Sequence, residues 1–221
     1  MRALSWNLFH GRAVPDRPRS LLPEFSAAIA GWDWDVALLQ EVPPWWPEAL
    51  AAAAGADHRL VRTSRNALLP LRRALAQRRP DLMKSNGGGA DAILVRGAAI
   101  AEHRTWRLRL HPERRFVHAV RLADGHWIGN VHAQANPKPL AHADMAVAGA
   151  TLVRWAGHAP VLLGGDCNVP DPVVAGFTDA GGHGIDRFFV RGGLNPEGPV
   201  RRLPREGLSD HAPVLVTLRS S

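Results

Sequence analysis

Residues 161–168 read VLLGGDCN, an apolar run followed directly by an acidic and an amide side chain. A short apolar run that ends at glycines is typical of a strand buried in a sheet, so Val161 to Leu163 predict such a strand. Asp166 and Asn168 would then lie where the strand leaves the sheet. This stretch therefore predicts a buried strand that carries polar side chains at its end.

The same arrangement recurs at four other places in the chain. A polar residue directly follows each of the runs ALSW, VALLQ and WIGNV, and a pair of polar residues comes directly before the run APVLVTL. In chain order these polar residues are Asn7, Glu41, His132 and the pair Asp210 and His211. If the strands share one sheet edge, all five places meet there. The last strand should then run antiparallel to the others, because its polar residues stand at its start.

Polar residues that meet in this way predict a particular kind of site. It would bring Glu41, Asp166 and Asp210 close together, with Asp186 as a further candidate. Carboxylates this close repel one another and raise their own pKa values unless a cation neutralises them. Carboxylate and amide oxygens suit a hard divalent cation, Mg²⁺ or Mn²⁺. With histidines beside the cation to move protons, the group has the parts needed to attack a phosphate ester.

The other apolar runs and helical spacings predict a layered fold. We expect further strands at residues 3–6, 36–39, 92–95, 116–122, 127–131, 187–190 and 214–218, and helices at residues 21–30, 47–54 and 138–155. The sequence Ala123-Asp124-Gly125 joins two of these strands and is a hairpin signal. Hairpins mixed with strand–helix units predict an α+β layered sandwich and not a doubly wound parallel sheet.

Composition excludes several classes of protein. The 221 residues are 46% hydrophobic, which is enough for a sizeable core and excludes a disordered chain. The single cysteine, Cys167, excludes an internal disulfide framework and a multi-cysteine zinc site. No apolar stretch approaches membrane-spanning length, and residues 1–12 lack a basic-then-apolar signal layout. We therefore expect a cytoplasmic protein without a membrane span, and we expect a monomer.

The net charge of +7 fits an anionic partner or substrate through long-range attraction. Only Lys84 and Lys138 are lysines, so arginine carries almost all of the positive charge. Seven arginines lie in one stretch without a carboxylate: Arg59, Arg62, Arg65, Arg72, Arg73, Arg78 and Arg79. This stretch forms either an arm that neutralises nucleic-acid phosphates or a solvated helix whose Leu68, Leu71 and Leu75 pack inward.

Six segments taken in order resemble the endonuclease/exonuclease/phosphatase superfamily: SWNLFHGR, LLQEVPP, NVHAQAN, GGDCNVPD, GIDRFF and SDHAPV. That superfamily includes pancreatic-type deoxyribonucleases, abasic-site nucleases, inositol-polyphosphate phosphatases and neutral sphingomyelinases. The resemblance extends from Asn7 to Val214. It implies one domain, residues 1–221, folded as a four-layer α/β/β/α sandwich of two mostly antiparallel mixed sheets packed face to face with flanking helices. It also implies a Mg²⁺- or Mn²⁺-dependent phosphoesterase site at one edge.

Carried over residue by residue, the resemblance implies a metal site and a water site. Asn7, Glu41 and Asp210 would bind the metal ion, with Asp210 alternatively holding the hydrogen bonds of the site. Asp166 and Asn168 would orient the attacking water and the phosphate oxygens. Their spacing fits this role, because residues two apart in an extended chain face the same side.

The resemblance also implies two catalytic histidines. His211 would accept the proton of the attacking water while Asp186 holds its ring. His132 would protonate the leaving oxygen or stabilise the pentavalent charge. Deoxyribonucleases give this second histidine a carboxylate partner, and Asp91 is the nearest candidate in this chain.

The basic charge, the two histidines and the Asp186-Arg187 dipeptide favour a phosphodiesterase that acts on DNA or RNA. Arg187, Asn168 and Trp45 are expected to bind the substrate. Trp45 would either stack on a base or sugar or pack against the following helix. Two alternatives stay open. One is a phosphatase, or a phospholipase resembling sphingomyelinases, that acts on small or lipid phosphates, and the other is a non-catalytic anion-binding module.

Overall fold

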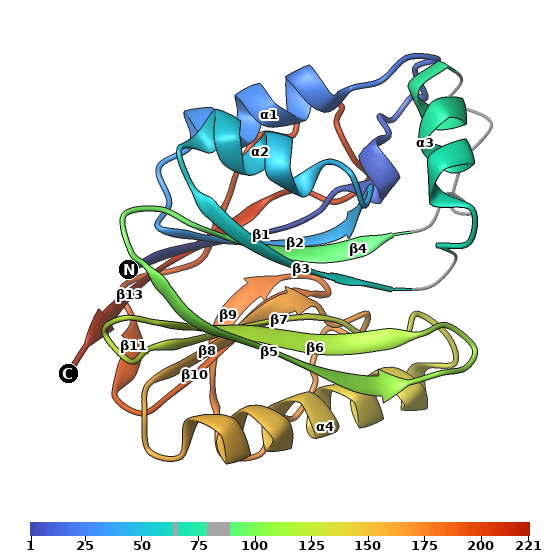
Figure 1. Ribbon diagram of the computed structural model, residues 1–221. Helices are drawn as coiled ribbons and strands as arrows, with labels where there is room; N and C mark the ends of the chain where they lie inside the picture. Colours follow the sequence, from blue (N-terminus) through green and yellow to red (C-terminus); the bar gives the residue numbers. More distant parts are fainter. Residues whose placement is uncertain (64–65, 79–88) are drawn as a thin grey trace.

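The computed structural model describes residues 1–63, 66–78 and 89–221, and these residues form four layers. Figure 1 shows two β-sheets packed face to face between helices. Helices α1 (Leu22–Gly31) and α2 (Pro47–Ala54) cover the outer face of one sheet, and α4 (Lys138–Ala156) covers the outer face of the other. The predicted α+β sandwich with flanking helices is confirmed.

The first sheet has the strand order β11-β13-β1-β2-β4-β3, and β12 also pairs with β13. Its strands are β1 (Arg2–Asn7), β2 (Val36–Val42), β3 (Asp57–Arg62), β4 (Ala90–Val95), β11 (Leu194–Pro196), β12 (Arg201–Arg202) and β13 (Val214–Ser220). Strands β1 and β2 are parallel and are connected through α1, whereas β13 runs antiparallel to β1. The predicted direction of the last strand is confirmed.

The second sheet has the strand order β5-β6-β7-β8-β10-β9. Its strands are β5 (Ile100–Arg109), β6 (Arg115–Leu122), β7 (Trp127–His132), β8 (Val161–Asp166), β9 (Thr178–His183) and β10 (Asp186–Arg191). Strands β6 and β7 form the predicted hairpin, and β7 and β8 are parallel with α4 as their crossover. Each sheet therefore contains one parallel strand–helix–strand unit.

Both sheets are buried on both faces, which explains their continuous apolar runs. In β8, Leu163 packs toward α4, whereas Leu162 packs between the sheets. Gly164 follows where the sheets approach closely: a Cβ atom there would lie 2.7 Å from Phe188 and 2.8 Å from Leu38 of the first sheet. The glycines of VLLGG thus let β8 pack against its neighbours on both sides.

A buried pair of amides links the two sheets. Asn130 of β7 donates from Nδ2 to the carbonyl oxygens of Leu39 and Ala92, each at 3.0 Å. Gln40 of β2 donates from Nε2 to Asn130 Oδ1 at 2.8 Å. Because Glu41 follows Gln40 directly, this link lies beside the predicted site residues and fixes the sheets relative to each other there.

Two expectations need correction. The strands that carry the polar ends do not belong to one sheet: β1, β2 and β13 lie in the first and β7 and β8 in the second. Strands β3, β5, β9, β11 and β12 were not predicted, because these segments are mostly half-exposed or exposed and lack apolar runs. Helix α3 (Leu69–Arg78) corresponds to the helix that was one of the two alternatives for the arginine-rich stretch.

The inward packing expected for Leu68, Leu71 and Leu75 is wrong. Leu68 is 73% exposed and Leu71 is 66% exposed, and no described residue of α3 is buried. Arg65 and Arg79 of the arginine-rich stretch lie outside the described residues. Within the described ranges, no helix has both the length and the apolar character needed to cross a membrane.

Replacing Asn130 by alanine should lower the free energy of unfolding by about 2–4 kcal/mol, because the Gln40 amide and two buried carbonyl groups lose their partner. Urea denaturation measures this change. Asn195→Ala, which alters an exposed side chain, serves as the control and should change stability by less than about 0.5 kcal/mol. Equal stability of the two variants would contradict the role given to Asn130.

Candidate active site

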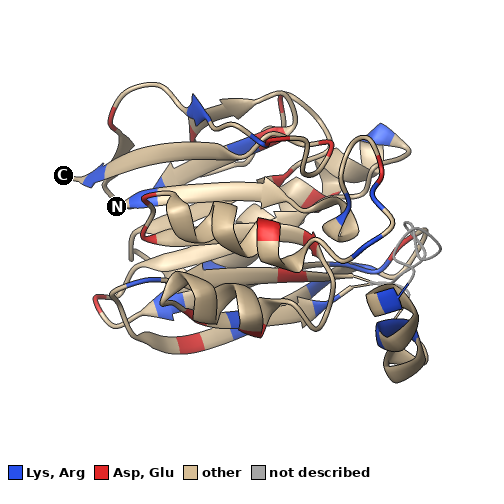
Figure 2. Ribbon diagram, turned by 90° about the horizontal axis from the view of Figure 1, so that it is seen from above, with Lys and Arg blue, Asp and Glu red and all other residues tan. Residues whose placement is uncertain are grey.

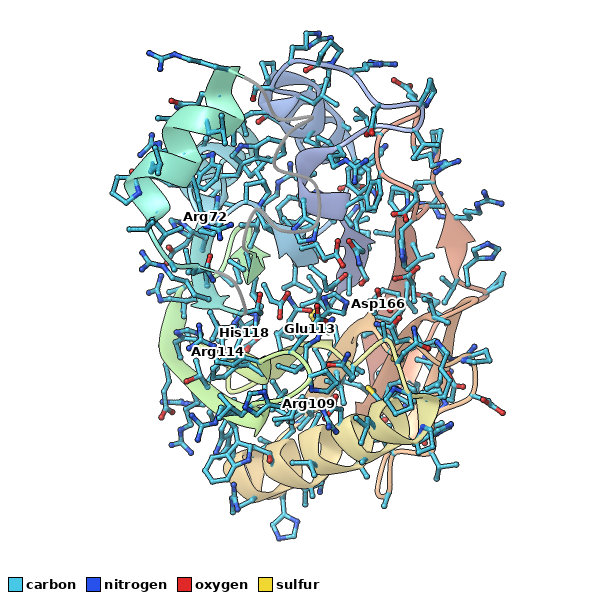
Figure 3. All side chains as sticks on the ribbon, turned by 90° about the vertical axis from the view of Figure 1, so that its right-hand side faces the viewer. Arg72, Arg109, Glu113, Arg114, His118 and Asp166 are labelled. Atoms are coloured by element: carbon cyan, nitrogen blue, oxygen red, sulfur yellow. The ribbon has the colours of Figure 1, made fainter. Side chains whose placement is uncertain are left out.

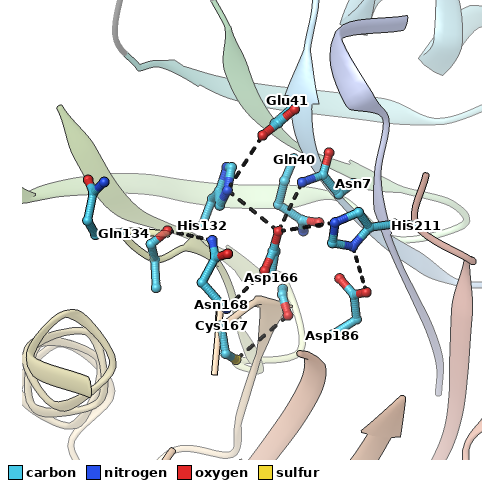
Figure 4. A network of polar contacts seen from close by, with 12 residues as sticks. Asn7, Gln40, Glu41, His132, Gln134, Asp166, Cys167, Asn168, Asp186 and His211 are labelled. Atoms are coloured by element: carbon cyan, nitrogen blue, oxygen red, sulfur yellow. Dashed lines mark hydrogen bonds and ion pairs between the residues drawn. The ribbon is translucent and has the colours of Figure 1, made fainter. Parts of the chain in front are cut away.

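The polar strand ends meet at one edge of the sandwich (Figure 4). Strands β1 and β2 and the segment before β13 supply side chains from the first sheet, and β7, β8 and β10 supply them from the second. A cavity of about 250 Å³ lies between them. Of the predicted site residues, it is lined by Asn7, Glu41, His132, Asp166, Asn168, Asp210 and His211. This is the edge that faces the viewer in Figure 3, where Asp166 is labelled.

Strand register explains the convergence within the second sheet. Asp166 ends β8 and lies directly across from His132 in the parallel pair with β7. On its other side, Asp166 faces Asp186 at the start of the antiparallel β10. Three adjacent strands therefore bring three ionisable side chains to one edge. In the first sheet, Asn7 ends β1 next to Gln40 of β2.

Irregular backbone aims other side chains into the cavity. The pairing of β2 with β4 shifts register between Leu39 and Val42, and Glu41 lies within this shift with a φ of 50°. Asn168 and Ser209 also have positive φ values, 55° and 59°. Non-glycine residues seldom adopt this conformation, and such strain concentrates at functional sites.

Asp166 lies at the centre of the polar network in Figure 4. Its Oδ2 accepts a hydrogen bond from Asn7 Nδ2 at 3.0 Å, and its Oδ1 accepts one from the backbone N–H of Asn168 at 2.9 Å. Burial, together with the charge of Asp186, raises the pKa of Asp166 to about 6, against the opposing charge of His211. Asp166 is thus held rigidly between the two sheets.

His211 forms a dyad with Asp186. Nδ1 of His211 lies 2.8 Å from Asp186 Oδ2, and its Nε2 lies 3.8 Å from Asp166 Oδ2. Burial opposes the charged form of His211, but the hydrogen bond to Asp186 and the charges of Asp186, Asp166 and Asp210 outweigh it and raise its pKa to about 9. The carboxylate holds the ring so that Nε2 faces the centre of the site.

His132 reaches the same centre from the opposite side. Its Nε2 lies 3.5 Å from Asp166 Oδ2 and 3.8 Å from Glu41 Oε1. Its other nitrogen, Nδ1, lies 2.8 Å from Nη1 of the buried Arg115. Burial lowers the pKa of His132 well below its usual value, and the positive charges of Arg115 and His211 lower it further.

The partner expected for His132 therefore differs from the one observed. Arg115 occupies that place, and both carboxylate oxygens of the buried Asp91 lack a hydrogen-bond partner among the described residues. Sequence analysis missed Arg115, although the predicted hairpin places it opposite the end of β7. Glu113 and Thr63, which also line the cavity, were missed too, because neither belongs to an apolar run that ends in a polar residue.

Two residues predicted to bind substrate lie outside this cavity. Arg187 forms an ion pair with Asp179 of β9. Trp45 packs against the core beneath α1 and α2, and its side chain also borders a separate groove beside Arg73 of α3. The third, Asn168, lines the cavity and donates from Nδ2 to the carbonyl of Ala133 at 2.9 Å.

The charges of the site fit a divalent cation. In the part of the chain that the structure describes, the ion-pair partners of Glu41, Asp166 and Asp186 are all histidines, not arginine or lysine. Three residues, Asp166, Asp186 and His211, each offer one possible ligand atom. These three atoms all lie within 4.8 Å of one another, a spacing that can hold a metal ion. Oxygen-rich groups of this kind suit hard divalent ions.

Comparisons with known proteins identify the class. Residues 4–211 match the Endonuclease/Exonuclease/phosphatase family, and the chain belongs to that family. Its members are metal-dependent phosphoesterases, nucleases and phosphatases among them. A search of curated proteins found no significant match.

Solved structures show the same fold at low sequence identity. A functionally unknown conserved protein from Enterococcus faecalis V583 has 18% identity and a TM-score of 0.74, with 100% of both chains covered. Mannosyl-6-phosphatase from Bacteroides thetaiotaomicron has 15% identity and a TM-score of 0.71, with 99% of each chain covered. A humanized D. rerio TDP2 has 15% identity and a TM-score of 0.69, covering 100% of this chain and 99% of that one.

Asp91 makes the stability of the metal-free protein depend on pH. Burial, and then the charges of Glu41 and Asp166, raise the pKa of Asp91 from 3.8 to about 7, although Arg115 opposes the shift. Between these pH values the folded state keeps a proton that the unfolded state has lost, so stability falls as pH rises. Above about pH 7 the loss is complete, at roughly 4 kcal/mol.

Asp91→Asn should therefore gain stability relative to the unsubstituted protein as pH rises from 4 to 8. Guanidinium unfolding in EDTA at both pH values measures the difference. Asp171→Asn, a substitution at an exposed position, should keep the pH dependence of the unsubstituted protein. An Asp91→Asn variant that shows that same dependence would show that Asp91 does not carry the shift.

Proposed function

We propose that this chain is a Mg²⁺- or Mn²⁺-dependent phosphodiesterase that hydrolyses its substrate by in-line attack of water, with nucleic acid as the leading substrate class. The observation that carries the proposal is the placement of two histidines on opposite sides of Asp166. His211 is oriented by Asp186 at 2.8 Å, and His132 approaches from β7 at 3.5 Å. Glu41, which has no arginine or lysine partner in the described part of the chain, borders the same cavity.

Asn7, Glu41 and Asp210 would hold the metal ion at this edge of the sandwich. When bound, it would neutralise carboxylate charge and polarise the phosphate group. Lys138 does not line the cavity, and its ammonium group donates to the carbonyl of Asn168 at 2.7 Å. The negative charge of the side chains around the cavity could therefore be neutralised by a bound cation.

The two histidines and Asp166 have separate roles toward the attacking water and the phosphate group. Asp166 orients the attacking water, and His211 accepts its proton at Nε2 while Asp186 holds the ring. A bound cation would neutralise part of the charge of the neighbouring carboxylates and would lower the pKa of His211 from about 9, so that the ring could act as a base. Asn168 and His132 contact the phosphate oxygens, with His132 on the side of the leaving oxygen.

Nucleic acid is favoured by the arginines around α3. The described arginines of the stretch are Arg59, Arg62, Arg72, Arg73 and Arg78, and residues 58–80 contain no carboxylate. Helix α3 stands apart from both sheets at one end of the molecule, with its basic residues visible in Figure 2. Thr63 and Gly89, which come before and after α3 in the chain, line the cavity. A backbone polyanion seated in the cavity would therefore pass the basic helix.

A phosphatase acting on a small phosphomonoester is the second candidate. The cavity of about 250 Å³ has room for a phosphate and a small attached group. The mannosyl-6-phosphatase structure also matches this chain over 99% of both chains.

His211→Ala should lower turnover by about 10²–10⁴-fold, the contribution typical of a positioned general base, while the unfolding temperature stays near that of the unsubstituted protein. Asp186→Asn should give a smaller loss, because the ring is retained but loses its carboxylate. His142→Ala, on the exposed face of α4, is the matched control and should keep full turnover. An unchanged rate in His211→Ala would remove the proposed base.

A substrate panel separates the two candidates. Supercoiled plasmid, single-stranded RNA, a phospholipid and a hexose 6-phosphate are each assayed with Mg²⁺, with Mn²⁺ and with EDTA. A nuclease should nick the plasmid or cleave the RNA only with metal, and its rate should fall steeply as salt rises because phosphate contacts release counterions. Release of inorganic phosphate from the hexose phosphate alone would favour the phosphatase. Turnover that persists in EDTA would contradict both.

The double variant Arg73→Gln/Arg78→Gln tests the basic helix. It should weaken cleavage of nucleic acid and flatten its salt dependence, yet leave hydrolysis of a small synthetic phosphodiester unchanged. Arg201→Gln/Arg202→Gln changes the charge equally on exposed residues of β12 and serves as the control. Equal effects of the two double variants would show that only net charge matters.

A further inference from the structure

Arg115 is a buried cation beside the proposed catalytic groups. It is the first residue of β6, is 7% exposed and lines the cavity. Val117 pairs with Val131 across the hairpin, so Arg115, two residues earlier, comes beside His132. Its Nη1 lies 2.8 Å from His132 Nδ1, and its Nη2 donates to Glu113, which is labelled in Figure 3.

The chemistry of the guanidinium group fixes the state of the histidine ring. Arginine carries only N–H donors and keeps its charge in proteins, so His132 Nδ1 must offer its lone pair to Nη1. A hydrogen on Nδ1 would point at the hydrogen of Nη1, which excludes both the Nδ1–H tautomer and the imidazolium form. The ring is therefore neutral, and its hydrogen is on Nε2.

That hydrogen faces the site. His132 Nε2 is the nitrogen that lies 3.5 Å from Asp166 Oδ2 and 3.8 Å from Glu41 Oε1. Both oxygens lie beyond good hydrogen-bond distance, so the Nε2–H remains available to a ligand in the cavity. A carboxylate at Nδ1 would do the opposite of Arg115, because it would hold a proton on Nδ1 and favour the charged ring.

We propose that Arg115 is a positioning residue that holds His132 as a neutral Nε2–H donor, so that His132 stabilises the charge on the phosphate oxygens by a hydrogen bond and does not act as an imidazolium acid. This rests on the proposed function for the presence of a phosphate. It selects one of the two roles expected for His132. No proton is transferred by His132 in this role, so the leaving oxygen takes its proton from water. The neutral ring is already in place before substrate binds.

Nuclear magnetic resonance of the metal-free, unsubstituted protein tests the tautomer without any need for activity. With ¹⁵N-labelled histidine at pH 7, the His132 ring should show a proton on Nε2 and none on Nδ1. The spectrum of His132→Asn, which lacks only that ring, assigns the signals among the 11 histidines. A protonated Nδ1, in either the neutral or the charged ring, would overturn the inference even if the protein proves to be a phosphodiesterase.

Substitution of Arg115 then tests the consequence. Arg115→Met should allow the Nδ1–H tautomer to appear and should lower kcat by about 10- to 100-fold with little change in KM. Arg115→Lys, which restores a donor, should recover the Nε2–H tautomer and most of kcat. Arg121→Met, on the same strand but paired with Glu102 away from the cavity, is the control.

The outcomes keep this inference apart from the proposed function. If Arg115→Met keeps the tautomer and the kcat of the unsubstituted protein, Arg115 does not position His132. If Arg115→Met does not fold, the tautomer of His132 in the unsubstituted protein and the kcat of Arg115→Lys show whether Arg115 positions His132. If no substrate of the panel is hydrolysed, the proposed function fails, while the tautomer measurement still confirms or refutes the role of Arg115.

Discussion

The contact between Gln40 and Asn130 is the constraint on which the site depends. It joins the two sheets by side-chain amides in a fully buried region, where an unpaired polar group is costly. Glu41 follows Gln40 directly and His132 comes two residues after Asn130, so the link sets how far apart the two halves of the site lie. Each sheet by itself supplies only some of the site residues, and the packing of the two sheets brings all of them together.

The second consequence of this packing is electrostatic. Acidic side chains from both sheets enter one cavity, and the side chains that lie within ion-pair distance of them are almost all histidines. Two carboxyls respond with raised pKa values, and one histidine, bound to a carboxylate, becomes more basic. The other histidine is bound to Arg115 and becomes less basic. One site thus holds two imidazole rings in opposite states. His132 is neutral and is able to donate a hydrogen bond, whereas His211 would accept a proton once a cation neutralises the carboxylates around it.

The sequence predicted the strands that are buried on both faces and helix α2 with its observed bounds, because uninterrupted apolar runs and helical spacing leave few alternatives. It did not predict β5, an edge strand whose exposed arginines interrupt any apolar pattern. It assigned the converging strand ends to one sheet edge, since spacing does not reveal which sheet a strand joins. Arg115 was missed because the expected partner of His132 was a carboxylate. The position of the Trp45 side chain depends on where the next helix packs, and the local sequence does not determine this.

Binding of Mn²⁺ to the metal-free protein, followed by isothermal titration calorimetry, tests most directly whether the polar strand ends form a cation site. We expect saturable binding by the unsubstituted protein and by Glu48→Gln, a substitution at an exposed position of α2. Binding by Glu41→Gln should be weaker by about 10-fold or more, because a carboxylate ligand from the first sheet is lost. Equal affinity in Glu41→Gln, or no binding by the unsubstituted protein, would contradict a cation site at these strand ends.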